Sequence, residues 1–115
     1  MRQTERDNEQ LGVILRYCAR LDETRGYFGA DYEVFAGSVP YQDSCSLCLI
    51  QIGEAVGRIS EEFRDMHPQI DWRAIYGMRC HLVHGYGNFD PEIAWDAMEN
   101  YLPTLRAFCE EHFEE

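Results

Sequence analysis

The sequence has 115 residues, a length that suits one compact domain with one core and leaves no room for two. Apolar residues make up 45% of it, which indicates a globular chain and excludes a disordered one. The formal net charge is −11, so the average field of the molecule repels polyanions. No segment has the roughly 18 apolar residues that a membrane span needs.

The amino-terminal segment 1–10 is polar and lacks the apolar core of a signal peptide. We therefore expect a cytoplasmic protein with no membrane partner. The odd number of cysteines, five, favours reduced thiols over a disulfide framework. Most of these cysteines fall on apolar helical positions, where cysteine acts as a small hydrophobic residue.

Helical periodicity dominates the first half of the chain. A first helix is predicted over about 6–24, with one apolar face formed by Leu11, Ile14, Leu15, Cys18 and Leu21. A short helical turn is predicted near 31–36, between glycines. Pro40 then opens a long core helix that we expect to run to about Arg64, with apolar positions at Cys45, Cys48, Leu49, Ile52, Ala55, Val56, Ile59 and Phe63.

Two further helices are predicted from their end signals. Asp71 is a candidate N-cap for a helix from Trp72 to about His84, with Gly85 following its end. Asp90-Pro91-Glu92 starts the last helix, which Pro103 should kink, and the acidic tail 110–115 should be frayed. The sum is a single all-α domain over 1–115, an antiparallel bundle of four to five helices.

Titratable side chains gather between Arg79 and Tyr86. The segment 72–86 holds Arg73, Arg79, His81 and His84 and no acid, so its local charge opposes that of the whole chain. A guanidinium beside an imidazole suits RNA cleavage without a metal. The histidine exchanges protons with the 2′-hydroxyl or the leaving oxygen, and the arginine holds the phosphate. Tyr86 is a candidate phosphate ligand.

The spacing of the pair sets a geometric condition. Arg79 and His84 are five residues apart, which is about 140° of rotation on an ideal helix, so they do not share a face. They converge only if the helix ends or distorts near His84, which Gly85 and Gly87 permit. One chain supplies one such histidine, whereas the reaction benefits from an acid and a base, and a symmetric dimer supplies two.

The sequence resembles the HepT-like toxins of the HEPN superfamily. The resemblance is carried by "IGEAVG" at 52–57, "HPQIDW" at 67–72 and "YGMRCHLVHGY" at 76–86, the last of which contains the Arg-x4-His-x-Tyr motif of that family. It spans about residues 40–108. It implies a HEPN-like α-helical homodimer whose motif lines a cleft between protomers.

The resemblance also implies a function. Such proteins are ribonuclease toxins paired with a nucleotidyltransferase-fold (MNT) antitoxin, which transfers AMP to the motif tyrosine. Arg79 and His84 would then be catalytic, and Tyr86 would be the AMP acceptor. The family usually has a polar residue, often Asn, directly after the motif arginine, where this chain has Cys80. A thiol cannot replace the paired donor and acceptor of an amide.

Cys80, His81 and Glu54 are candidate supporting residues. Glu54 lies among apolar neighbours, and we favour a structural role for it over an acid–base role. We expect His81 to pack or face solvent rather than react. Gly53 and Gly57, four residues apart, permit a close helix approach, with a dimer seam as one candidate location. The two tryptophans fall on apolar stripes and are expected to pack in the core.

Other interpretations stay open. Cys80 and the charge of −11 favour a catalytically weak or inactive subunit that serves as the partner of a nucleotidyltransferase. In a third interpretation the chain is a helical adaptor and the motif is a structural helix cap. Cys45-x2-Cys48 with His81-x2-His84 resembles a four-ligand zinc set, but both pairs lie in helical patterns. We expect no metal and no cofactor.

Overall fold

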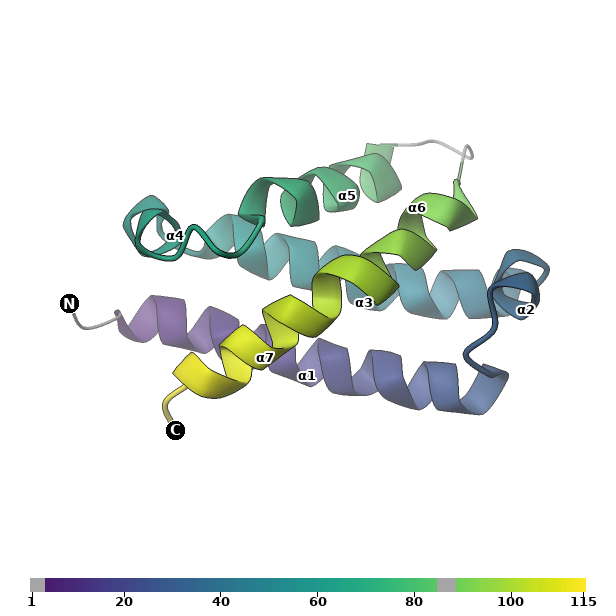
Figure 1. Ribbon diagram of the computed structural model, residues 1–115, viewed down its shortest axis with the longest axis horizontal. Coiled ribbons are helices and arrows are strands. Elements are labelled where there is room, and N and C mark those ends of the chain that lie inside the picture. Colours follow the sequence, from purple (N-terminus) through teal and green to yellow (C-terminus); the bar gives the residue numbers. More distant parts are fainter. Residues whose placement is uncertain (1–3, 85–88) are drawn as a thin grey trace.

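The computed structural model describes residues 4–84 and 89–115, and every regular element in these ranges is helical. The elements are α1 Glu5–Phe28, α2 Tyr32–Ala36, α3 Val39–Arg58, α4 Glu61–Met66, α5 Trp72–His84, α6 Pro91–Asp96, the π-helical η1 Ala97–Tyr101, and α7 Leu102–His112. The chain runs up and down along α1, α3, α5 and the continuous α6–η1–α7 stretch (Figure 1). The predicted all-α antiparallel bundle is confirmed.

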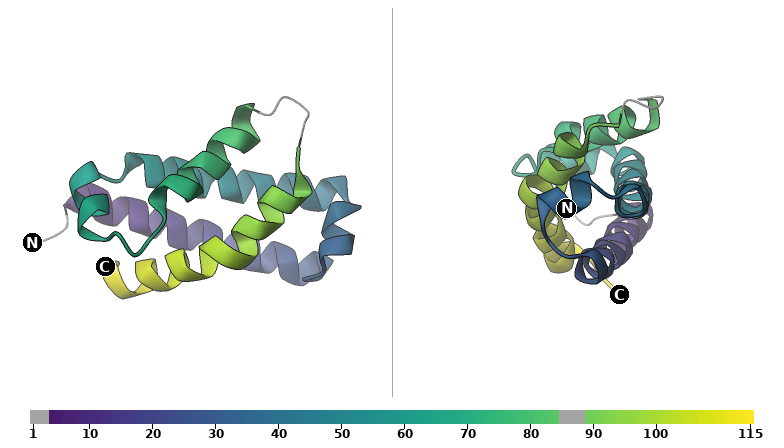
Figure 2. Two further views of the ribbon diagram at one scale, coloured as in Figure 1. Left: turned by 45° about the horizontal axis from the view of Figure 1, so that its top comes forward. Right: turned by 90° about the vertical axis from the view of Figure 1, so that its right-hand side faces the viewer.

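Helix α3 is the central element, because it packs on α1 along one side and on α5 along another. Helix α7 packs on α1, and η1 contacts α5, so the four long stretches close into a ring around the core (Figure 2). All eight apolar positions predicted on residues 45–63 are buried. The predicted face of α1 also points inward, with Leu11, Ile14, Cys18 and Leu21 buried. Burial of these stripes supplies the main stabilisation of the helices.

The predicted N-cap of α5, Asp71, is confirmed. The carboxylate of Asp71 accepts a hydrogen bond from the Ala74 N–H at 3.0 Å, and α5 runs from Trp72 to His84. Trp72 is buried, and its ring N–H donates to the carbonyl of His67 at 3.0 Å. The Asp90 side chain likewise caps α6, accepting from the Glu92 N–H at 3.0 Å.

The predicted long helix to Arg64 is wrong in its last turn. Helix α3 ends at Arg58, Ile59 is extended, and Ser60 caps a separate α4 by accepting from the Phe63 N–H. A buried carboxylate enforces this break. Asp7 of α1 accepts hydrogen bonds from the backbone N–H of Ser60 at 2.8 Å and from its hydroxyl at 2.7 Å. Apolar periodicity continues through Phe63, so it cannot reveal a break made by a residue 53 positions away.

A kink was predicted at Pro103, and the structure has a π-helical turn, η1, just before it. The proline has no N–H to donate to the carbonyl four residues earlier, and the preceding turn widens into η1, where the Leu102 N–H donates to the Ala97 carbonyl. The expectation of a frayed tail from residue 110 is wrong. Helix α7 continues to His112, and the backbone of Glu114 exchanges two hydrogen bonds with the side chain of Asn8 on α1.

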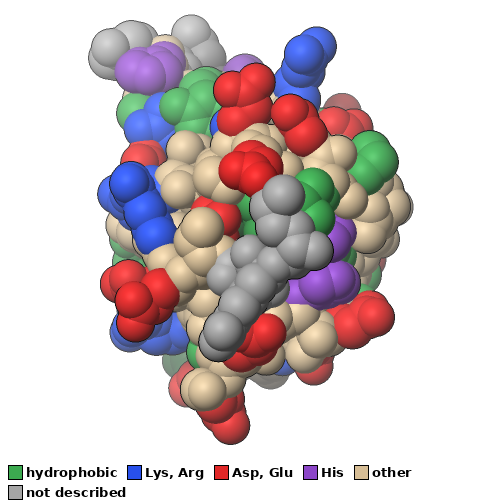
Figure 3. All heavy atoms as spheres, turned by 90° about the vertical axis from the view of Figure 1, so that its left-hand side faces the viewer, with side chains coloured by type: hydrophobic (Ala, Val, Ile, Leu, Met, Phe, Trp, Pro, Cys, Tyr) green, Lys and Arg blue, Asp and Glu red, His purple; other side chains and the backbone are tan. Residues whose placement is uncertain are grey.

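Charged groups of both signs cover the end of the molecule near the amino terminus and α4 (Figure 3). Acidic side chains are spread over this face, and basic ones lie mainly along its left edge and top in Figure 3. None of the described helices is both long and apolar enough to cross a membrane.

Candidate functional site

Arg79 lies on the face of α5 that packs against α3. The two helices come together at Gly53, where an added Cβ would lie 2.1 Å from the Cβ of Arg79. No side chain fits in that space, so the glycine is what allows the arginine stem to lie against the α3 backbone. The sequence predicted a close approach at Gly53 and Gly57. In the structure both glycines pack against α5 of the same chain, Gly53 against Arg79 and Gly57 against Tyr76.

Glu54, the residue after that glycine, holds the Arg79 guanidinium. Its carboxylate accepts a hydrogen bond from Arg79 Nε at 2.5 Å and forms a second contact with the terminal Nη2. Arg58, one turn further along α3, approaches the other carboxylate oxygen at 3.8 Å. Of the Arg79 side-chain surface, 18% is exposed. The side chain is therefore partly buried, and these contacts fix the orientation of its guanidinium.

Cys80 contacts the same guanidinium from its own helix. Arg79 Nη1 donates to the Cys80 sulfur at 3.7 Å. Hydrogen bonds to Cys80 and to Glu54 raise the pKa of Arg79 above its ordinary value, so the group remains a cation. Because Cys80 and His84 are four residues apart, they lie in one row on α5. Arg79 Nη1 therefore contacts a residue of the same row as His84.

His84 is the last residue of α5 and is exposed, as is His81 one turn earlier. Whether the helix ends or distorts at the histidine, as the predicted geometry requires, depends on residues 85–88, which lie outside the described residues. Along a regular helix the two backbone positions still differ by about 140°, so the approach of the two side chains depends on the reach of Arg79. Tyr86, like Gly85 and Gly87, lies outside the described residues.

Tyr76 lies next to Arg79 on α5, and the sequence points to the aromatic residues near Tyr76 as candidates for stacking on bases. The guanidinium carbon of Arg79 lies 5.6 Å from the centre of its ring. On α3 the ring meets Gly57, where an added Cβ would lie 2.6 Å from a ring carbon. Two small residues on α3, four apart, thus face two long residues on α5, three apart. That pairing of spacings is the sequence signal that Tyr76 and Arg79 lie side by side against α3.

The cysteine pair of the zinc interpretation lies in the core. Cys45 and Cys48 are both buried on α3, whereas His81 and His84 are exposed on α5. Burial raises the pKa of the Cys45 thiol to about 12, and the neighbouring Cys48 acts in the same direction. Among residues 4–84 and 89–115, no group of three or more His, Cys, Asp or Glu side chains is arranged to hold a metal ion.

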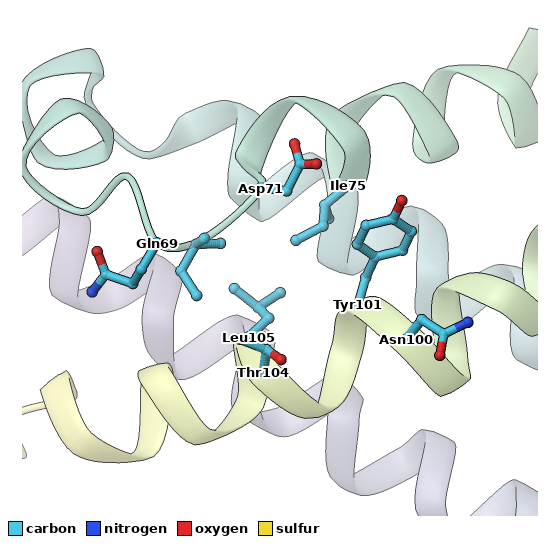
Figure 4. A pocket seen from close by; sticks show the side chains of 8 residues that line it. Gln69, Asp71, Ile75, Asn100, Tyr101, Thr104 and Leu105 are labelled. Atoms are coloured by element: carbon cyan, nitrogen blue, oxygen red, sulfur yellow. The ribbon is translucent and has the colours of Figure 1, made fainter.

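A small hollow of about 190 Å³ lies between the α4–α5 connection, α5 and the η1–α7 stretch. Ile75, Leu105 and the ring of Tyr101 converge on it, and Gln69 and Asn100 point outward (Figure 4). Arg79 packs against α3 and does not line this hollow. The candidate site is therefore on the α3 side of α5.

The fold and the arginine–histidine spacing together define a HEPN-like helical protein. A model of the family described as "Ribonuclease HepT-like" matches residues 14–112. The chain belongs to the HepT-like ribonuclease family.

Several relatives carry ribonuclease names. The chain is 37% identical over 95 residues to "Putative RNase TTE0752" of Caldanaerobacter subterraneus subsp. tengcongensis, covering 83% of each chain. It is 32% identical over 76 residues to "Putative RNase MJ0125" of Methanocaldococcus jannaschii, covering 66% of each. It is 36% identical over 55 residues to "Probable ribonuclease HepT" of Thermococcus cleftensis, covering 48% of this chain and 50% of that one. No solved structure matches the chain.

Proposed function

We propose that this protein is a metal-independent endoribonuclease that acts in the cytoplasm as the toxin of a toxin–antitoxin pair. The observation that carries the proposal is the Arg79 guanidinium, held by Glu54 on the same helix as the exposed His84. Membership of a ribonuclease family and the ribonuclease names of its relatives support the same function.

Each residue has a role in the proposed reaction. The 2′-hydroxyl oxygen attacks the adjacent phosphorus, and the bond from phosphorus to the 5′-oxygen of the next nucleotide breaks. One His84 takes the proton of the hydroxyl, and a second His84, from the other copy in a homodimer, protonates the leaving oxygen. Arg79 holds the phosphate and the charge that builds on it. The products are a 2′,3′-cyclic phosphate and a 5′-hydroxyl.

Cleavage of single-stranded RNA in the presence of EDTA tests this proposal. The wild-type protein should cut RNA and leave 2′,3′-cyclic ends. His84→Ala should lower the rate at least about 100-fold, which is the usual contribution of a positioned acid or base. His81→Ala is the matched control, because His81 is an exposed histidine one turn earlier on the same helix, and it should cleave normally. Equal cleavage by wild type and His84→Ala would remove His84 from the mechanism.

One contact favours a second function, that of a weakly active partner subunit of an MNT-type nucleotidyltransferase antitoxin. Cys80 offers only a sulfur, 3.7 Å from Arg79 Nη1, where relatives usually carry a polar amide. In either function the antitoxin transfers AMP to Tyr86, and the bulky anion blocks the phosphate position beside Arg79.

Co-expression with a neighbouring transferase gene tests the pairing. Mass spectrometry should find one AMP on wild-type protein and none on Tyr86→Phe. Cys80→Asn then separates the two functions, because a large gain in RNA cleavage indicates a weakened enzyme, and an unchanged, already substantial rate indicates an active toxin.

A further inference from the structure

Tyr76 presents an aromatic ring at the surface beside the proposed phosphate position. It lies one turn before Arg79 on α5, and 40% of its surface is exposed. The ring is held in place from two directions, by Gly57 of α3 and by the Arg79 guanidinium 5.6 Å from its centre. A large aromatic side chain that is both exposed and held in position is suited to stacking on another flat group.

A hollow of about 630 Å³ opens next to this ring. It follows the surface of α5 from Tyr76 and Gly77 back to Trp72 and Arg73, and reaches Arg64 on α4. Its volume lies within the range of pockets that bind small ligands, about 300–1,000 Å³. Tyr76 lines this hollow, and its ring also contacts Arg79. It therefore connects the hollow to the proposed phosphate position.

The hollow carries charges of both signs. Arg64 and Arg73 supply guanidinium groups, and Nε of Arg64 is buried with no hydrogen-bond partner in the described part of the chain. Carboxylates of Glu61, Asp65 and Asp71 lie in the same lining, and Asp71 is also the cap of α5. A site for phosphate alone would not hold three acids.

A nucleobase matches this mixture. Its edge has both hydrogen-bond donors, which carboxylates accept, and acceptors, to which guanidinium groups donate. Its flat face stacks on a tyrosine ring. An RNA strand whose phosphate lies at Arg79 has its neighbouring base within reach of Tyr76, because the ring and the guanidinium are in contact.

We propose that Tyr76 and the adjacent hollow form a base-binding subsite for the nucleotide that flanks the scissile phosphate, with Tyr76 as the stacking platform. This inference rests on the proposed ribonuclease function. It predicts that affinity for RNA depends on the bases and not only on the phosphates.

Fluorescence anisotropy in a His84→Ala background, which binds RNA without cutting it, tests the subsite. One probe is a labelled oligoadenylate of about eight nucleotides, and the other is an abasic oligomer with the same number of phosphates. With Tyr76 present, oligoadenylate should bind about tenfold more tightly than the abasic oligomer. Tyr76→Phe should keep that ratio, and Tyr76→Ala should bring it to within about twofold of one.

Two comparisons separate stacking from a loss of fold. Tyr27→Ala removes another exposed tyrosine, 83% exposed on α1, and should leave both affinities unchanged. The abasic oligomer should bind Tyr76→Ala as well as it binds the Tyr76 protein, because the phosphate contacts remain.

The possible results are distinct. If Tyr76→Ala keeps the tenfold preference for oligoadenylate, the subsite is wrong, while cleavage that depends on His84 still supports the proposed function. If the wild type neither binds nor cleaves RNA, the proposed function fails and the subsite fails with it.

Discussion

In the proposed reaction, Arg79 has to meet two requirements that oppose each other. It must be fixed in direction to stabilise a phosphate, and it must remain able to bind an anion. Glu54 meets the first requirement through two contacts to one side of the guanidinium. The Nη1 group is directed instead to the Cys80 sulfur, a weak acceptor that a phosphate oxygen displaces at little cost. In the proposed reaction, Glu54 would position the guanidinium, and a phosphate oxygen would take the place of the thiol at Nη1.

Glu54→Gln should therefore separate the two kinetic constants. The neutral amide holds the guanidinium less firmly, so kcat should fall about tenfold, since small misplacements of a catalytic group are costly. Removal of a negative charge beside the phosphate should leave KM equal or lower. Steady-state cleavage of a short RNA measures both constants. A variant with unchanged kcat and a raised KM would show that Glu54 helps to bind RNA rather than to position Arg79.

At the level of elements, the seam between α3 and α5 determines where the site is. Gly53 and Gly57 bring the α3 backbone close enough for the stems of Arg79 and Tyr76 to lie across it. Glu54 then points at the guanidinium because it follows the first glycine. The starts of α5 and α6 were predictable, since Asp71 and Asp90 cap them with local side-chain contacts. The break at Ser60 was not, because Asp7 imposes it from another helix.

Gly53→Ala should open this seam. The new Cβ would lie 2.1 Å from the Cβ of Arg79, so one helix must move, and the free energy of unfolding should fall by about 2 kcal/mol. Gly77→Ala is the matched control on α5. Nothing lies within 4 Å of its added Cβ, so this helix should gain stability, by about 0.5–1 kcal/mol.

Urea unfolding followed by circular dichroism measures both changes. Gly53→Ala should also lose RNA cleavage below the unfolding transition, because Arg79 is displaced. Equal stability of the two alanine variants would contradict the packing of Gly53 against Arg79.

At the scale of the molecule, the sequence predicted the bundle and the helix that carries the motif. Periodic apolar positions specify which face of each helix is buried, and these faces can be identified without knowledge of their partners. The geometry of the site was harder to predict from the sequence, because the carboxylate that holds Arg79 belongs to Glu54, 25 residues away. Spacing along one helix could show only that Arg79 and His84 lie on different faces. It could not show that the Arg79 guanidinium donates to Cys80, which lies in the same row of α5 as His84.

The proposed acid and base come from two copies of His84, so activity should require a homodimer. Val83 lies next to His84 and one turn after Arg79, and 37% of its surface is exposed. In the proposed homodimer the two His84 side chains meet at one phosphate, so Val83→Glu should place a charge at the proposed contact between protomers, shift the protein to monomers in sedimentation velocity and lower cleavage at least about tenfold. Val39→Glu is the matched control, because Val39 is 65% exposed at the start of α3, and it should remain an active dimer. A wild-type monomer that cleaves RNA, or a fully active dimer of Val83→Glu, would mean that the site is complete within one chain.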